Sequence, residues 1–133
     1  MSKNTANNFT ITNLIKGNPP VGGLPFLDIK EAMLGKKYEL SLVFASKTAL
    51  RTLNREYRGK DASTDILSFP ISKTSGEIFI CLDEARKEAR KFGRSFENFV
   101  GFLFIHGLAH LEGLRHSSRM EAQEKKFRGK FGI

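Results

Sequence analysis

Residues 96–111, FENFVGFLFIHGLAHL, predict a helix that is apolar on nearly every face. A helix of this kind belongs in the middle of a domain, because each of its faces needs a packing partner. Ser95, directly before it, is a favourable N-cap residue, and Gly113, just after it, favours a left-handed end. The stretch therefore predicts a fold that is organised around one buried helix.

Strands and helices are expected on both sides of this buried helix. Runs of apolar residues indicate four strands, and the turn-forming KTSG between the last two indicates a hairpin. Capping residues, amphipathic spacing and terminal glycines indicate four further helices. The expected strands are 9–15, 38–45, 64–71 and 77–82, and the expected helices are 25–34, 47–58, 83–91 and 117–131. A chain of 133 residues with this content is expected to form a single α+β domain, residues 1–133.

The net charge favours a polyanionic partner. Lysine and arginine total 22, against 14 aspartate and glutamate residues, which gives a formal charge of +8. RNA, DNA and an anionic membrane all fit this charge, and so does a basic surface that is simply solvated. The N-terminus lacks a secretory signal, and no apolar run is long enough for a membrane span. We therefore expect a cytoplasmic protein with no membrane partner, and a buried thiol at Cys81, which lies in an apolar run.

All three histidines of the chain lie in HGLAHLEGLRH, residues 106–116. His106 and His110 are four residues apart, so on a helix both rings lie on one face. Gly113 can end the helix and turn His116 back toward that pair. Three imidazoles leave the fourth ligand position open, as in catalytic zinc sites, and nickel or copper also suits them. Three ordinary core histidines are the alternative, but the spacing favours a metal site on the central helix and the turn after it.

The spacing HxxxHxxGxxH is also similar to the metzincin metalloprotease motif. In those proteases the residue after the first histidine is a glutamate that acts as general base. Gly107 stands at that position in this chain and has no side chain to take a proton. Peptide hydrolysis by that mechanism is therefore disfavoured, although Glu112 offers another carboxylate nearby in the sequence.

Three blocks of the sequence match the motifs of one family in the same order. HGLAHLEGLRH is similar to HGxLHLxGYDH, and LNREYRGKDASTDILSFP (53–70) is similar to LNxxYRxKDxPTDVLSF. GEIFICLDEA (76–85) is similar to GDIxIxxxxA, and the three blocks cover about half of the chain. Together they resemble the YbeY-type bacterial endoribonucleases that mature ribosomal RNA.

The resemblance implies a compact α+β fold, in which about five helices pack on a mixed four-stranded sheet. It implies a metal-dependent endoribonuclease that cleaves RNA phosphodiester bonds, and single-stranded RNA is the expected substrate. The implied role is maturation of the small-subunit rRNA 3′ end, ribosome biogenesis and quality control in the cytoplasm, with the ribosome or ribosomal proteins as partners. The implied cofactor is one zinc ion per chain, with nickel as another possibility, on His106, His110 and His116.

Arg58 and Lys60 fall in the second of these blocks. The resemblance assigns the family's arginine to Arg58, which would stabilise the extra charge of the transition state. Its alternative role is to bond the carbonyls at the end of the preceding helix. Arg58 and Lys60 are both expected to bind substrate, since a cation can hold the RNA backbone. No aromatic RNA-binding signature is present, so the sequence gives no information on base selectivity.

Two other functions are compatible with the sequence. Leu114 and Arg115 stand where the family has Tyr-Asp, and a carboxylate near a metal-binding histidine can orient its ring. Ala109 and Ser63 also depart from the motifs. A non-catalytic ribosome-assembly factor, which keeps the ion for structure, is therefore the first alternative. A metal-dependent hydrolase of a small molecule or peptide is the second, and both Gly107 and the positive charge disfavour it.

Overall fold

The structure, a computed structural model, describes residues 2–113 and 117–133, with side chains from residue 7 onward. Its centre is a mixed sheet of five strands in the order β1-β2-β3-β5-β4. The β1–β2 and β4–β5 pairs are antiparallel, and β3 is parallel to both β2 and β5. The strands are β1 (Ser2–Ala6), β2 (Phe9–Asn13), β3 (Glu39–Phe44), β4 (Ile66–Ser72) and β5 (Ser75–Ile80).

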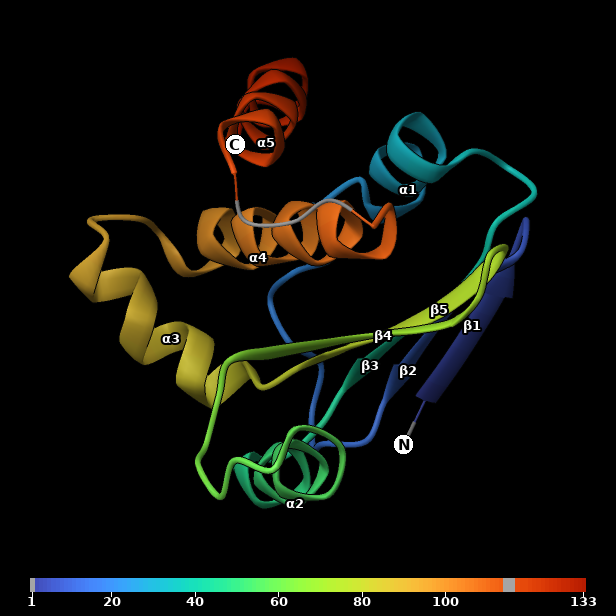
Figure 1. Cartoon of the computed structure of the whole chain (residues 1–133). Helices are drawn as coiled ribbons and strands as arrows, with labels where there is room; N and C mark the ends of the chain where they lie inside the picture. Colours follow the sequence, from blue (N-terminus) through green and yellow to red (C-terminus); the bar gives the residue numbers. More distant parts are fainter. Residues whose placement is uncertain (1, 114–116) are drawn as a thin grey trace.

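Helices cover the two faces of this sheet unequally (Figure 1). On one side α4 lies over the strands, with α1 and α5 packed against it, and α3 contacts α4 beyond the end of the sheet. On the opposite side lies α2 alone (Figure 1). The helices are α1 (Phe26–Leu34), α2 (Lys47–Arg58), α3 (Leu82–Lys91), α4 (Phe96–Leu111) and α5 (Ser118–Phe131). The predicted class, an α+β domain with a mixed sheet and five helices, is confirmed.

The main core surrounds α4, as its apolar sequence predicts. Phe104, Ile105 and Leu108 of this helix are fully buried. The ring of Phe104 meets that of Phe26 edge to face, with a centroid distance of 5.0 Å. Each such side chain contributes about 1.5–3 kcal/mol by leaving water. This core fixes α4 on the sheet and thereby fixes every residue that the helix carries.

Capping residues set the first and last residues of α2 and the first residue of α4 where the sequence predicts them. Ser46 accepts a hydrogen bond from the Ala49 N–H, and Gly59 closes the same helix with a φ of 69°. Ser95 accepts from the Asn98 N–H in the same way at the start of α4. Glycine suits such a left-handed φ because it has no Cβ to clash with the backbone. Correct caps explain why the bounds of α2 and α4 were predictable.

The first strand of the sheet was not predicted. Ser2–Ala6 is polar, and it pairs with β2 through its backbone, so no apolar alternation marks it. Asn7 and Asn8 form the turn between the two strands with φ values of 50° and 63°. Asparagine tolerates this conformation, which two-residue hairpin turns require. Two adjacent asparagines were therefore the available signal for this hairpin.

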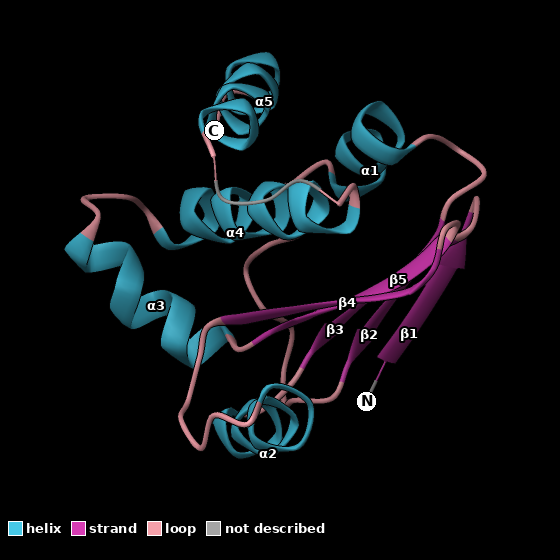
Figure 2. Ribbon diagram, in the orientation of Figure 1, coloured by secondary structure: helices cyan, strands magenta, loops and turns pink. Residues whose placement is uncertain are grey.

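Two smaller expectations concern Cys81 and the connection after β2. Cys81 is buried as predicted, and burial raises the pKa of its thiol. Strand β2 ends at Asn13, and residues 14–25 form the loop that crosses to the helical layer (Figure 2). In the described parts of the chain, no helix has both the length and the apolar character that a membrane span requires.

Candidate functional site

His106 and His110 lie on the one stripe of α4 that is not fully buried. Both side chains are partly exposed, whereas Gly107, Leu108 and Ala109 between them are buried. Their rings are nearly perpendicular, and the two Nε2 atoms are 3.1 Å apart. The predicted pairing on one helix face is thus present. His116, the third predicted ligand, lies outside the described residues.

A cavity of about 390 Å³ joins the two histidines to Arg58. Arg58 is the last residue of α2, and Gly59 ends the helix there in a left-handed turn. The structure therefore brings together residues from two distant sequence blocks. Lys60 is exposed and is not among the lining residues, which are Arg58, Thr64, Ile66, Ser68, His106 and His110.

Gly107 allows α4 to approach the sheet closely beside this cavity. A Cβ at this position would lie 2.9 Å from Ser68 Oγ and 3.0 Å from the Cδ1 atoms of Ile66 and Ile78. Ser68 Oγ also donates a hydrogen bond to the Gly107 carbonyl at 3.3 Å. A glutamate does not fit here without displacing the helix. The missing metzincin base thus has a steric cause, and the predicted substitute, Glu112, is exposed and does not line the cavity.

A buried carboxylate contacts the other side of the His106 ring. Glu124 of α5 places Oε1 2.9 Å from His106 Nδ1, and its side chain is 8% exposed. An ionised carboxylate can only accept, so this contact favours a hydrogen on Nδ1. The remaining nitrogen of His106, Nε2, then carries the lone pair and faces His110. Met120 and Phe127, on the same face of α5, are buried as predicted and anchor the helix.

Asp65 is a second carboxyl group within electrostatic reach of His106. It immediately precedes β4. Burial raises its pKa above the ordinary value, and Glu88 of α3 adds to the shift. Hydrogen bonds from the backbone N–H groups of Asp65 and Ile66, together with His106, oppose it. Asp65 is therefore a second acidic side chain near His106, besides Glu124.

The geometry of the two histidines fits two ligand positions of a metal ion. In tetrahedral zinc sites with Zn–N bonds of about 2.0–2.1 Å, two nitrogen ligands lie about 3.3 Å apart. The Nε2 separation of 3.1 Å in this chain is close to that value. Among residues 7–113 and 117–133, no group of three or more His, Cys, Asp or Glu side chains completes a metal site. The described residues thus include two of the three predicted ligands.

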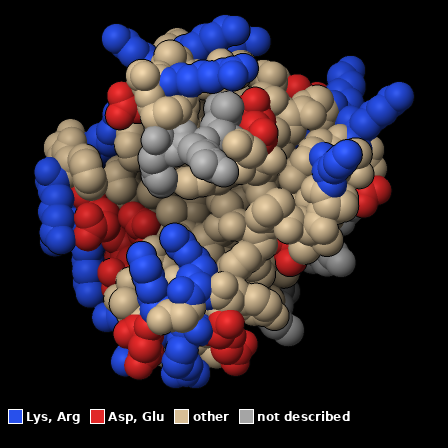
Figure 3. Space-filling model, viewed as in Figure 1, with Lys and Arg blue, Asp and Glu red and all other residues tan. Residues whose placement is uncertain are grey.

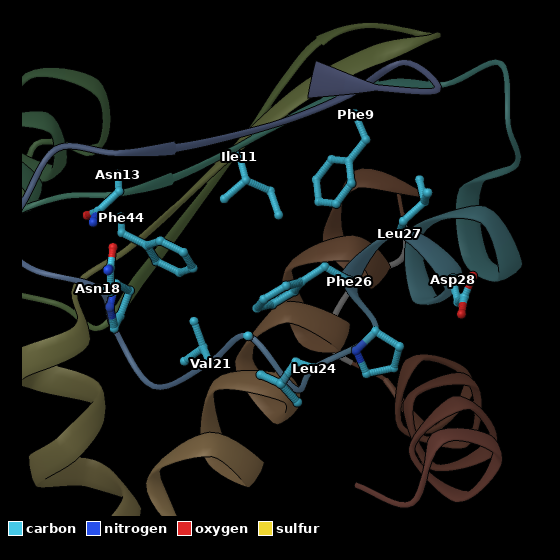
Figure 4. Close-up of a pocket in the computed structure, with 13 residues that line it drawn as sticks. Phe9, Ile11, Asn13, Asn18, Val21, Leu24, Phe26, Leu27, Asp28 and Phe44 are labelled. Carbon is cyan, nitrogen blue, oxygen red and sulfur yellow. The ribbon is translucent and has the colours of Figure 1, made fainter. Parts of the chain in front are cut away.

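Another cavity, of about 650 Å³, opens between the sheet and the loop before α1 (Figure 4). Phe9, Ile11 and Phe26 point into it, and hydrocarbon forms most of its wall. Asn13 at one end is already engaged, since its Nδ2 donates to the Gly17 carbonyl at 2.9 Å. Asp28 is the one charged residue among the described residues that line this cavity, whereas the other cavity brings two histidines and an arginine together, so the histidine cavity is the candidate functional site.

Three site residues were missed by reasoning from the sequence. Thr64, just before β4, and Ser68, within it, lie inside the TDILSF block, but a single hydroxyl there gives no signal by itself. Glu124 had a usable signal, because it lies on the same helical face as Met120 and Phe127. A carboxylate on an apolar stripe needs partners, and here they are His106 and, with its Nη1 3.9 Å from Glu124 Oε1, Arg128.

Most of the chain is similar to known proteins. A family model described as Endoribonuclease YbeY matches residues 26–130. An Endoribonuclease YbeY of Alkaliphilus metalliredigens is 41% identical over 102 residues, which cover 68% of this chain and 66% of that relative. The protein of the same name from Staphylococcus carnosus is 37% identical over 113 residues, covering 76% of this chain and 72% of the relative.

A solved structure shares the fold. The solution structure of TM1509 from Thermotoga maritima matches with a TM-score of 0.64 and 27% sequence identity. The match covers 93% of this chain and 91% of that one. The arrangement of the elements around α4 is therefore found in a second protein.

Proposed function

The chain belongs to the YbeY endoribonuclease family, and we propose that it is a metal-dependent endoribonuclease specific for single-stranded RNA. Its role would be maturation of the small-subunit rRNA 3′ end in the cytoplasm, in ribosome biogenesis and quality control, with the ribosome or ribosomal proteins as partners. The single observation that carries the proposal is the cavity shared by Arg58, His106 and His110. The name of the relatives, Endoribonuclease YbeY, supports the reaction class.

His106, His110 and His116 would hold the metal ion, zinc or nickel. The two described rings meet the requirement of converging nitrogen atoms. When bound, such an ion supplies Lewis-acid chemistry for phosphodiester cleavage. The space at Gly107 is too small for a glutamate beside the two histidines. This site therefore lacks the general base of metzincin peptidases.

Arg58 would bind the scissile phosphate from the opposite wall of the cavity. Its planar guanidinium can engage two phosphate oxygens and stays charged at all relevant pH values. The negative charge on those oxygens grows in the transition state, so the attraction is strongest there. The two hydroxyl groups in the wall have partners within the protein: Thr64 Oγ1 donates to the Ile66 carbonyl and Ser68 Oγ to that of Gly107. They shape the site, and Lys60 would contact RNA outside the cavity.

Replacing Arg58 with glutamate is expected to reduce cleavage of single-stranded RNA by at least about a hundredfold. The cause is loss of the transition-state cation and repulsion of the phosphate. Metal content and the melting temperature are expected to stay unchanged, because Arg58 is exposed at the end of α2. Cleavage of a labelled oligoribonucleotide, elemental analysis and thermal melting followed by circular dichroism measure the three quantities.

Arg55→Glu provides the matched control for this experiment. Arg55 is also exposed on α2, one turn earlier, and its Nη1 lies 3.7 Å from Asp61 Oδ1. It does not line the cavity, so the same charge reversal is expected to lower cleavage only slightly. An equal loss of cleavage in Arg58→Glu and Arg55→Glu would mean that Arg58 contributes only to the general positive charge of the surface. Full cleavage by Arg58→Glu would remove it from the mechanism.

A further inference from the structure

An exposed aromatic ring lies beside the cavity and has no role so far. Tyr57, on α2, is 69% exposed. Its ring meets the ring of Phe69 on β4 at a centroid distance of 5.5 Å, and Phe69 meets Phe79 on β5 at 5.9 Å. Both contacts are edge to face. The exposed Tyr57 ring therefore packs on Phe69, which in turn packs on Phe79. This packing already restricts the Tyr57 side chain, so less side-chain entropy would be lost on binding.

The connectivity of two elements puts this ring near the cavity, on the opposite face of the edge strand β4. Tyr57 directly precedes Arg58 on α2, and Phe69 directly follows Ser68 on β4. Arg58 and Ser68 both line the cavity. Because successive side chains of a strand point to opposite faces, Tyr57 and Phe69 lie across β4 from the histidines. Strand β4 is the edge of the sheet, so a flexible chain can cross it from one face to the other.

The charges around Tyr57 suit a polyanion. Arg55, Arg58 and Lys60 are exposed on α2 and on the loop after it. The space-filling view shows lysine and arginine side chains over this region, with aspartate and glutamate side chains beside them, below a largely uncharged area (Figure 3). A flat apolar surface next to cations fits an unpaired nucleobase with its phosphate. In a duplex each base is stacked between its neighbours, which cover its faces, so a duplex cannot use the ring in this way.

We propose that Tyr57 is a stacking platform for an unpaired base of the RNA, next to the phosphate that Arg58 binds. This inference rests on the proposed function and extends it to a base-binding subsite. A base on an aromatic side chain contributes about 1–3 kcal/mol, which corresponds to about 5- to 150-fold in affinity. Stacking depends on the ring and not on the hydroxyl, so phenylalanine should replace tyrosine and leucine should not.

The test measures binding of a short single-stranded oligoribonucleotide that contains 2-aminopurine, with chelator present so that no cleavage occurs. Wild type and Tyr57→Phe are expected to bind within about twofold of each other and to quench the probe on stacking. Tyr57→Leu is expected to bind at least about fivefold more weakly, without the quenching. Phe92→Leu is the matched control. Phe92 is 59% exposed and its ring also rests on another, Phe99 at 5.5 Å, but neither of its chain neighbours lines the cavity, whereas Tyr57 directly precedes Arg58.

Two outcomes would overturn the base-binding role. One is unchanged affinity and quenching in Tyr57→Leu, and the other is an equal loss in Phe92→Leu. Either result leaves the proposed function intact if wild-type protein loaded with metal still cleaves the RNA. A wild-type protein that neither binds nor cleaves single-stranded RNA would instead contradict the proposed function itself.

A separate observation, the contact between Glu124 and His106, carries a second inference. The Oε1–Nδ1 distance is 2.9 Å, and the carboxylate is nearly buried between α4 and α5. The other tautomer of His106 would turn a lone pair toward the carboxylate, which is unfavourable in a site with little water. Metal-binding histidines commonly donate their second N–H to such a group. Leu114–Arg115 provides no carboxylate where the family has an aspartate, whereas α5 does.

The geometry points to Glu124 as the positioning residue for His106. By accepting the Nδ1–H, Glu124 would leave the lone pair of His106 Nε2 free for the metal site. Glu124→Gln preserves the size of the side chain but removes the charge that selects the tautomer. Nitrogen-15 NMR of the metal-free protein should show His106 as the Nδ1–H tautomer in wild type and as a mixture in the variant. Zinc affinity, measured by competition with a chromophoric chelator, should fall by about 10- to 100-fold.

Glu121→Gln is the control for charge, because Glu121 is exposed one turn earlier on α5. This variant is expected to keep the tautomer and zinc affinity of wild type. A structural role for Glu124 alone would lower the melting temperature and leave the tautomer unchanged. That result, or equal zinc affinity in Glu124→Gln and wild type, would overturn the positioning role.

Discussion

His110→Ala is expected to lose the bound metal ion and to cleave single-stranded RNA at least about a thousandfold more slowly. The variant removes one of the two Nε2 atoms that converge at 3.1 Å. Lewis-acid stabilisation of a phosphoryl group contributes several kcal/mol to the transition state, and each 1.4 kcal/mol corresponds to about tenfold in rate. The fold is expected to survive, because the His110 side chain is partly exposed at the end of α4.

Metal content is measured by elemental analysis of protein that carries no histidine tag, since a tag would bind metal itself. Cleavage is measured with and without a chelator. Chelator-treated wild type should match the variant, which separates loss of the ion from damage to the RNA surface. If His110→Ala keeps one equivalent of metal and full activity, His110 is not a ligand. If wild type binds metal but cleaves no RNA, the non-catalytic assembly factor becomes the better account.

The sequence predicted those parts of the site that depend on one element alone. His106 and His110 share a face because a helix repeats every 3.6 residues, whatever surrounds it. Ser46 and Gly59 set the bounds of α2 through contacts within a few residues. Such local rules hold before any tertiary packing is known.

The remaining parts depend on how distant elements meet. Arg58 was assigned to the site by resemblance to a family, since a lone arginine at a helix end has ordinary uses. The place of Glu124 on the apolar stripe of α5 had a signal in the sequence, but its contact with His106 depends on how α5 packs on α4. The contact of Tyr57 depends likewise on how α2 meets the edge strand. Strand β1 was missed because it adds polar residues to the sheet through backbone pairing. These features depend on which elements lie close together in the fold, whereas the histidine pair depends only on spacing within one helix.

Gly107→Glu is expected to destabilise the domain by at least about 3 kcal/mol and to create no peptidase activity. The substitution would supply the glutamate of the metzincin motif. However, its Cβ alone would lie 2.9 Å from Ser68 Oγ and 3.0 Å from two isoleucine side chains. The carboxylate would then have to be buried between α4 and the sheet, or α4 would have to lift from its core. We expect the melting temperature to fall by about 10 °C or more.

Gly129→Glu separates this steric effect from helix propensity. Gly129 is also a helical glycine, on α5, but a Cβ there would meet nothing within 4 Å. Replacing an exposed helical glycine with a good helix former is expected to stabilise the protein by up to about 1 kcal/mol. Opposite signs for the two substitutions, measured by thermal and urea unfolding, would show that close approach of α4 to β4 excludes the glutamate. A stable Gly107→Glu variant that hydrolyses peptides would mean that the helix can move away, and that substrate class in this site depends on a single side chain.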